Sequence, residues 1–167
     1  MVRPRPARVY QAVLVRIVGR EGNQLEVSIL GYEHPEKTVD PWESNGLLVA
    51  LRVVSSHGTW EVVDPCLTTW EAARLAAWLA AAAVGPDRVA RRLAEPNVTV
   101  VAAPVGGRLQ LRICFELETR PPWAPSVRGG RDLCVDLDIA RDDAAAAAAE
   151  LRTDARRFPQ RGEDPTL

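Results

Sequence analysis

Cys66 stands where an apolar strand pattern passes into a helix pattern, in the stretch VVDPCLTTWEAARLAAWL from Val62 to Leu79. The thiolate is the nucleophilic form of cysteine, and a helix N-terminus lowers the pKa of a thiol. The stretch is therefore either an activated nucleophile or a strand-to-helix joint with a packed cysteine. Activation needs a base, and the two histidines are His34 and His57. His57 lies in a predicted turn at the far end of the strand before Cys66, which favours the joint.

Two further patterns are of residue types that occur in metal or phosphate sites. Asp136 and Asp138 share one face of a predicted strand, but a hard cation takes about six oxygen ligands and no others are evident. The segments GREG and PVGG lack the lysine of a phosphate loop and do not lie between a strand and a helix. We expect no metal, no cofactor and no catalytic residue.

The cysteine count and the charge restrict compartment and partners. Cys66, Cys114 and Cys134 form an odd set without a CxxC spacing, which argues against a disulfide framework and against zinc. A reducing compartment follows, and we predict the cytoplasm. A net charge of −1 gives no bulk attraction to nucleic acid. No run approaches the ~18 apolar residues of a membrane span.

The helix that follows the joint has a recognisable N-terminal capping signal. Thr68 followed by Glu71 is a capping box, in which each side chain satisfies a backbone N–H of the other residue. Leu75, Trp78, Leu79 and Ala82 fall on one arc of the following helix, so Trp78 is predicted to be a deeply docked apolar anchor. The structural residues of the joint are predicted to be Asp64, Cys66, Thr68, Glu71 and Trp78.

The elements that position these residues alternate between strands and helices. Hairpin links and period-two patterns indicate strands over 9–18, 24–30, 46–55, 59–63, 97–103, 108–118 and 132–139. One helix is predicted to begin after Thr68, and a second is predicted over 140–157. The segment 31–45 is expected to be a loop. The fold class predicted is α+β: a largely antiparallel sheet of about six to seven strands with two helices packed on one face. We expect a flexible arm over 1–7, a single domain over 8–158 and a tail over 159–167.

The polar face of the predicted sheet is rich in carboxylates. It is either an ordinary solvated face or an acidic surface that steers a basic partner, with Arg108 and Arg112 reducing its charge. Trp123, in the segment RPPW, is either an exposed aromatic anchor or a cover over the sheet edge. The candidate partner-binding residues are Glu116, Glu118, Asp136, Asp138 and Trp123.

Several segments occur together in an order that resembles WapI-type immunity proteins. They are GYEHP, DPCLTTWEAARLAAWL, EPNVTV, LRICFELETRPPW, VDLDIA and RFPQR, and they extend from about residue 31 to 161. Members of this family are thought to protect a bacterial cell from the toxic C-terminal domain of a wall-associated or Rhs-like polymorphic toxin. One departure concerns the family's NW-L segment, because Gly46 follows Asn45 where a tryptophan is usual.

The resemblance implies a binding protein and not an enzyme. Its partner would be a cognate toxin domain, often a nuclease, whose basic groove an acidic sheet face can block by mimicking phosphate. Two alternatives stay open: an orphan copy that serves as a scaffold or oligomerising module, and an enzyme that depends on Cys66. The oligomeric state and the identity of the toxin are not determined by the sequence.

Overall fold

The structure, a computed structural model, describes residues 14–93, 97–124 and 133–167 and contains two antiparallel sheets. The first sheet consists of β1 (Val15–Val18), β2 (Gln24–Tyr32), β3 (Gly46–Ser55) and β4 (Gly58–Thr68). The second consists of β5 (Val89–Arg92), β6 (Val98–Val105), β7 (Arg108–Phe115) and β8 (Leu133–Ile139). Within each sheet, neighbours along the chain are neighbours in space, so every pairing is a hairpin or meander connection.

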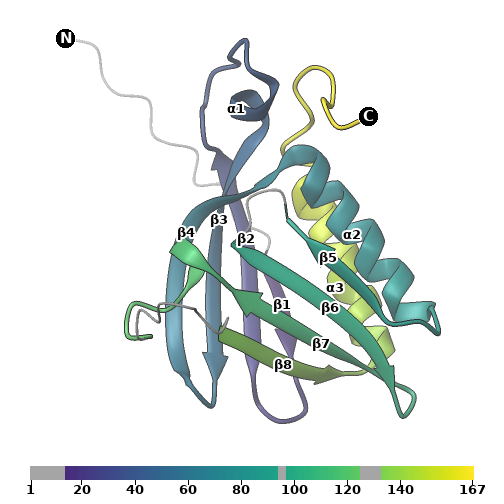
Figure 1. Cartoon of the computed structure of the whole chain (residues 1–167). Helices are drawn as coiled ribbons and strands as arrows, with labels where there is room; N and C mark the ends of the chain where they lie inside the picture. Colours follow the sequence, from purple (N-terminus) through teal and green to yellow (C-terminus); the bar gives the residue numbers. More distant parts are fainter. Residues whose placement is uncertain (1–13, 94–96, 125–132) are drawn as a thin grey trace.

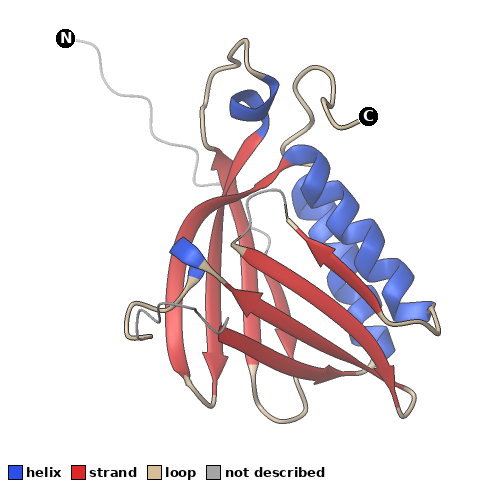
Figure 2. Cartoon of the chain, viewed as in Figure 1, coloured by secondary structure: helices blue, strands red, loops and turns tan. Residues whose placement is uncertain are grey.

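Three α-helices and one short 3-10 helix complete the fold. They are α1 (Pro41–Asn45), α2 (Thr69–Val84), α3 (Arg141–Ala155) and the 3-10 helix η1 (Leu117–Thr119). The strands of the second sheet cross those of the first obliquely, and α2 and α3 lie side by side along one flank (Figures 1 and 2). None of the helices in the described residues is long and apolar enough to cross a membrane.

The prediction of an α+β fold with antiparallel strands is confirmed, but the prediction of one sheet is wrong. Alternation along a strand identifies the buried face, and short turns identify hairpin partners. Neither says whether β4 pairs with the strands that follow α2. In the structure the chain leaves the first sheet through α2 and begins a second sheet at β5.

The boundaries of several elements also differ from prediction. The helix α1 lies within the predicted loop 31–45, and β5 was not predicted. β7 ends at Phe115 instead of residue 118, so Leu117 is 62 % exposed and does not point into the core. The predicted arm 1–7 and the first part of the strand predicted over 9–18 lie outside the described residues.

The core lies between the facing sheets and is closed at the flank by α2. Alternate residues of β7, including Leu109, Leu111 and Phe115, are almost fully buried. Trp60 of β4 packs edge-on against Phe115, with ring centroids 5.2 Å apart, and so joins the two sheets. On α2, Ala72 and Ala76 are completely buried and Ala83 nearly so, whereas Trp78 is half-buried at the margin of the core. Small side chains allow α2 and α3 to approach closely, which leaves the larger Trp78 at the edge.

Candidate binding surfaces

The strand-to-helix joint is built as the capping box requires. β4 ends at Thr68, and α2 begins at the next residue. The Glu71 amide donates to Thr68 Oγ1 at 3.3 Å, and Glu71 Oε2 accepts from the Thr68 amide at 2.9 Å. Both side chains are buried. Asp64, also buried, accepts a 2.6 Å hydrogen bond from Asn97 Nδ2, which ties this strand to the beginning of β6. The joint thus holds α2 and the second sheet in place.

Cys66 is packed in the core beside this joint. Its side chain is 2 % exposed, and burial, reinforced by the charge of Asp64, raises the pKa of the thiol to about 12. His57 lies in the exposed turn at the other end of β4. Nine residues of extended chain separate the two by roughly 30 Å. The structure therefore does not bring the thiol and the candidate base together.

Asn45, which sequence analysis did not single out, holds three segments together. Its Nδ2 donates to the carbonyls of Pro41 and Arg161 at 2.7 and 2.9 Å. Its Oδ1 accepts from Thr69 Oγ1 and from the Arg161 amide, each at 2.8 Å. The amide group is completely buried and fully satisfied. It links α1, the first turn of α2 and the C-terminal segment. Asn45 and the segment RFPQR, which ends at Arg161, therefore belong to one contact.

The prediction that the chain has no disulfide is wrong. Cys114 of β7 and Cys134 of β8 are direct cross-strand partners and form a disulfide. Cys66 is the remaining free cysteine. An odd count of three conceals one pair because the two partners are 20 residues apart and meet only through the strand register. The inference of a reducing compartment loses this support.

Of the candidate carboxylates predicted on the polar sheet face, Asp136 and Asp138 lie on β8 of the second sheet, and both are paired with arginines. Asp136 accepts two hydrogen bonds from Arg112, at 2.8 and 2.9 Å, and these lower the pKa of its carboxyl. Asp138 lies 2.6 Å from Arg108 and 2.7 Å from Arg20, and its pKa is lowered chiefly by the bond from Arg108.

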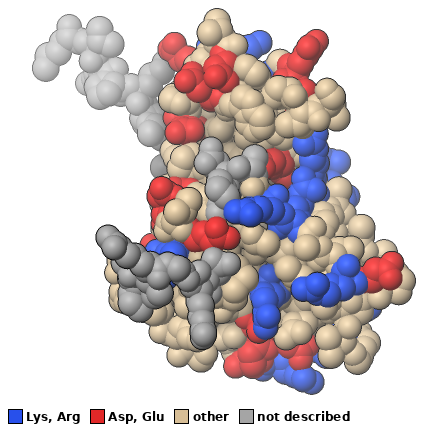
Figure 3. Space-filling model, viewed as in Figure 1, with Lys and Arg blue, Asp and Glu red and all other residues tan. Residues whose placement is uncertain are grey.

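This face consequently carries both signs of charge (Figure 3). Glu116 is 3.7 Å from Arg92, a further ion pair. Glu118 lies apart from these pairs on η1 and is exposed. Asp132 lies outside the described residues. The polar face of the second sheet therefore presents alternating positive and negative charges instead of a continuous acidic surface.

A turn after β7 presents apolar side chains to solvent. Leu117 adopts the left-handed region, with φ of 47°, and is 62 % exposed. A backbone of this kind costs about 1–3 kcal/mol in a residue other than glycine. Thr119 holds the turn from beneath: it is completely buried, and its Oγ1 donates to the Asn97 carbonyl at 2.6 Å. The Trp60 indole donates to the Thr119 carbonyl at 3.2 Å.

Trp123 adds another partly exposed apolar side chain near this turn. It is 47 % exposed and packs edge-on against Trp60, with centroids 5.9 Å apart. Its ring also lies over Gly58, where a Cβ atom would come within 2.9 Å. Trp123 therefore covers the sheet edge with one side and faces solvent with the other, and its role as an anchor for a partner stays a prediction. We call Leu117, Glu118 and Trp123 the η1 corner.

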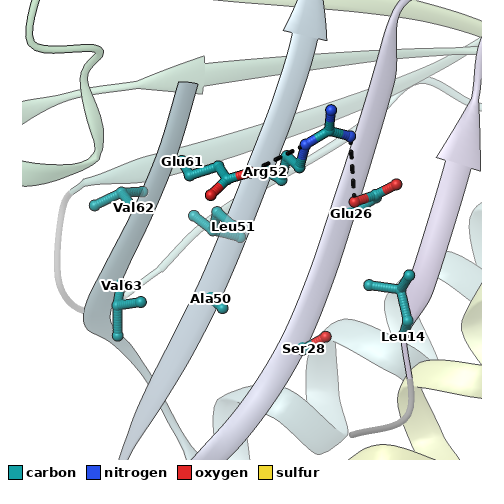
Figure 4. Close-up of a pocket in the computed structure, with 9 residues that line it drawn as sticks. All are labelled: Leu14, Glu26, Ser28, Ala50, Leu51, Arg52, Glu61, Val62 and Val63. Carbon is teal, nitrogen blue, oxygen red and sulfur yellow. Dashed lines mark hydrogen bonds and ion pairs between the residues drawn. The ribbon is translucent and has the colours of Figure 1, made fainter. Parts of the chain in front are cut away.

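The outer face of the first sheet contains a hollow of about 290 Å³ (Figure 4). Ser28 and Ala50 lie between the exposed side chains of Leu14 and Val63. At one side, Arg52 reaches Glu61 at 3.1 Å and Glu26 at 3.5 Å, so the charges satisfy one another. The nine described residues that line the hollow include no histidine or cysteine. Its chemistry suits an apolar group.

These features together define an α+β fold of two packed antiparallel sheets with exposed apolar side chains. In the part of the chain that the structure describes, no three His, Cys, Asp or Glu side chains form a group that could hold a metal ion. The model of the WapI-like immunity protein family matches residues 16–159, and the chain belongs to this family. The resemblance inferred from the motifs is thereby confirmed. No curated protein and no solved structure matches the chain.

Proposed function

We propose that this protein neutralises a toxin by binding the toxic C-terminal domain of a polymorphic toxin of the wall-associated or Rhs-like kind. Membership of the WapI-like immunity family is the observation that carries the proposal. The toxin would be a nuclease that acts in the cytoplasm, and the immunity protein would meet it there. Inhibition needs no chemistry by the immunity protein, since occupying the substrate groove is sufficient.

The η1 corner is the contact surface that we propose. A strained turn persists only where its surroundings enforce it, and buried Thr119 enforces this one while pointing Leu117 outward. Tryptophan is enriched among the residues that dominate binding energy. Trp123 is suited to this role because Trp60 already fixes its ring before a partner arrives. Little side-chain entropy would be lost on binding.

The charges near the corner set the expected orientation of the partner. Glu118 is exposed beside Leu117, and Glu116 borders it from the end of β7. Both would face basic residues of a nuclease groove, where complementary charge accelerates association. Asp136 and Asp138 are proposed as peripheral contacts, because their arginine partners already neutralise much of their charge.

The first experiment is to identify and then neutralise the partner. The tagged protein is isolated from its producing cells, and co-purifying fragments are identified by mass spectrometry. The captured toxin domain is then purified, and its activity and its affinity for the immunity protein are measured. We expect a stoichiometric complex that abolishes toxicity and rescues growth on co-expression. A captured domain that remains toxic in the complex would contradict the function.

The surface is tested with two matched tryptophan variants. Trp123 and Trp42 are 47 and 43 % exposed, and each packs edge-on against a buried tryptophan. We expect Trp123→Ala to weaken toxin binding at least about tenfold, as for an interface anchor. Trp42→Ala should leave affinity unchanged. Equal losses in the two variants would contradict the η1 corner while leaving the immunity function intact.

A further inference from the structure

A recess of about 400 Å³ lies far from the η1 corner in the fold, where the first turn of α2 meets the end of α3. Trp70 and Ala73 line it from α2, and Ala155 and Phe158 line it from the other side. Arg152 and Arg156 also contribute to the wall. They are one helical turn apart, because Arg156 keeps helical dihedral angles as the C-cap of α3.

Three side chains of this wall are hydrogen-bond donors without an acceptor among the described residues, whereas Thr69 and Gln160 donate to Asn45 Oδ1 and to the Gly162 carbonyl. Arg152 and Arg156 form no ion pair with any residue that the structure describes, whereas their neighbour Arg157 pairs with Asp154 at 2.7 Å. The indole Nε1 of Trp70 is buried and has no acceptor among the described residues. The described lining contains no aspartate or glutamate. The recess therefore carries uncompensated positive charge.

Much of the remaining lining is apolar, and its largest ring is fixed. Ala73, Ala155 and Phe158 present hydrocarbon in the same recess that Arg152 and Arg156 line. The ring of Trp70 is 4 % exposed and is held edge-on by Trp42, with centroids 5.2 Å apart. A ligand for such a site carries an anion and an apolar group side by side.

We propose that this recess binds the C-terminal carboxylate of a peptide whose last residue is apolar. A guanidinium binds a carboxylate through two parallel hydrogen bonds, and two arginines one turn apart can share one carboxylate. A C-terminal residue places its side chain on the carbon next to the carboxylate, which matches the proximity of arginines and hydrocarbon here. The proposal is independent of toxin binding, and its test needs no toxin.

The test compares a peptide with its amide. The pentapeptide Gly-Gly-Ser-Ala-Leu is titrated as the free acid and as the C-terminal amide. Binding is followed by calorimetry and by the indole N–H resonance of Trp70 in the ¹⁵N-labelled protein. We expect a dissociation constant in the millimolar range or tighter for the acid, a shift of the Trp70 resonance, and at least tenfold weaker binding of the amide.

Two variants and one anion complete the test. Arg152→Gln with Arg156→Gln should weaken binding of the acid at least tenfold, whereas Arg88→Gln, at another exposed arginine, should leave it unchanged. Unfolding by urea is measured in parallel, because cations at a helix C-terminus also stabilise the helix. If the double variant lost stability but bound the peptide normally, the proposal would fail. Equal binding of acid and amide, or competition by inorganic phosphate at equal concentration, would also overturn it.

Discussion

The turn from β4 into α2 and the turn from β7 into η1 both lead from a strand into a helix, and they are built in opposite ways. At the end of β4, Thr68 and Glu71 satisfy each other and are buried. At the end of β7, Leu117 adopts a left-handed backbone and exposes its side chain. The first turn maximises satisfied contacts within the chain. The second retains strain and leaves apolar surface available to another molecule.

The difference suggests a division of roles: the β4–α2 turn serves stability, and the η1 corner is available for the proposed binding. Substitutions near the β4–α2 turn remove buried hydrogen bonds and should unfold the protein. Substitutions in the η1 corner should change affinity and leave folding largely intact. This separation would suit the proposed toxin-binding function, because the proposed contact surface could change without loss of the fold.

The largest expected effect is at Asn45, which fixes Thr69 at the start of α2. Asn45→Ala removes four hydrogen bonds and leaves buried partners unsatisfied, so we expect the free energy of unfolding to fall by about 4 kcal/mol. Asn45→Asp keeps the two acceptor contacts but turns a buried carboxylate oxygen toward the Pro41 and Arg161 carbonyls, so we expect a loss at least as large. Urea unfolding measures both. Loss of toxin affinity without loss of stability would contradict the proposed separation.

Cys66, beside the β4–α2 turn, tests whether this region stays buried in the folded protein. With a pKa of about 12, against 9.0 for a model thiol, its thiolate fraction at pH 8 is about a thousandfold lower. We expect iodoacetamide to modify it only as fast as the protein unfolds, as measured by mass spectrometry. Because the unfolded thiol ionises first, its contribution to stability should be lost as pH rises from about 9 to about 12. Rapid alkylation of the folded protein would revive the enzyme hypothesis.

The disulfide tests whether the η1 corner depends on its loop closure. Cys114 and Cys134 close a loop of 20 residues that contains the whole corner. Reduction by dithiothreitol should lower the free energy of unfolding by about 3 kcal/mol, the usual value for a loop of this length. The Cys114→Ala, Cys134→Ala variant should have the lower stability from the start and not respond to dithiothreitol. An unchanged wild-type midpoint would show that strand pairing alone closes the loop.

The smallest expected change in stability is at Leu117. Leu117→Gly relieves the left-handed backbone, so the free energy of unfolding should stay constant or rise by up to about 1 kcal/mol. Affinity for the toxin domain should fall at least about tenfold, because the exposed leucine side chain is lost. Val105→Ala, at a residue 57 % exposed, is the control and should change neither quantity appreciably. A destabilised Leu117→Gly protein would show that the leucine serves folding.

The sequence identified elements whose signals are local. Thr68 and Glu71 are three residues apart, so the capping box was legible without any fold. The alternation from Leu109 to Phe115 defined the buried face of β7, and the structure confirms it. The same alternation failed at Leu117, because a strand pattern does not show where pairing stops. The last bond between these strands runs from the Glu116 amide to the Asn97 carbonyl, just before β6 begins, and the chain then turns.

What required the tertiary structure were contacts between distant segments. Asn45 meets Arg161 across 116 residues, and Cys114 meets Cys134 only through the register of β7 and β8. The charges of Asp136 and Asp138 could be counted from the sequence, but their neutralisation by Arg112, Arg108 and Arg20 could not. The sequence by itself therefore determined the family, the fold class and the joint, because these depend on short-range patterns. The division into two sheets, the disulfide and the partners of each charge depend on which strands become neighbours, and only the folded chain decides that.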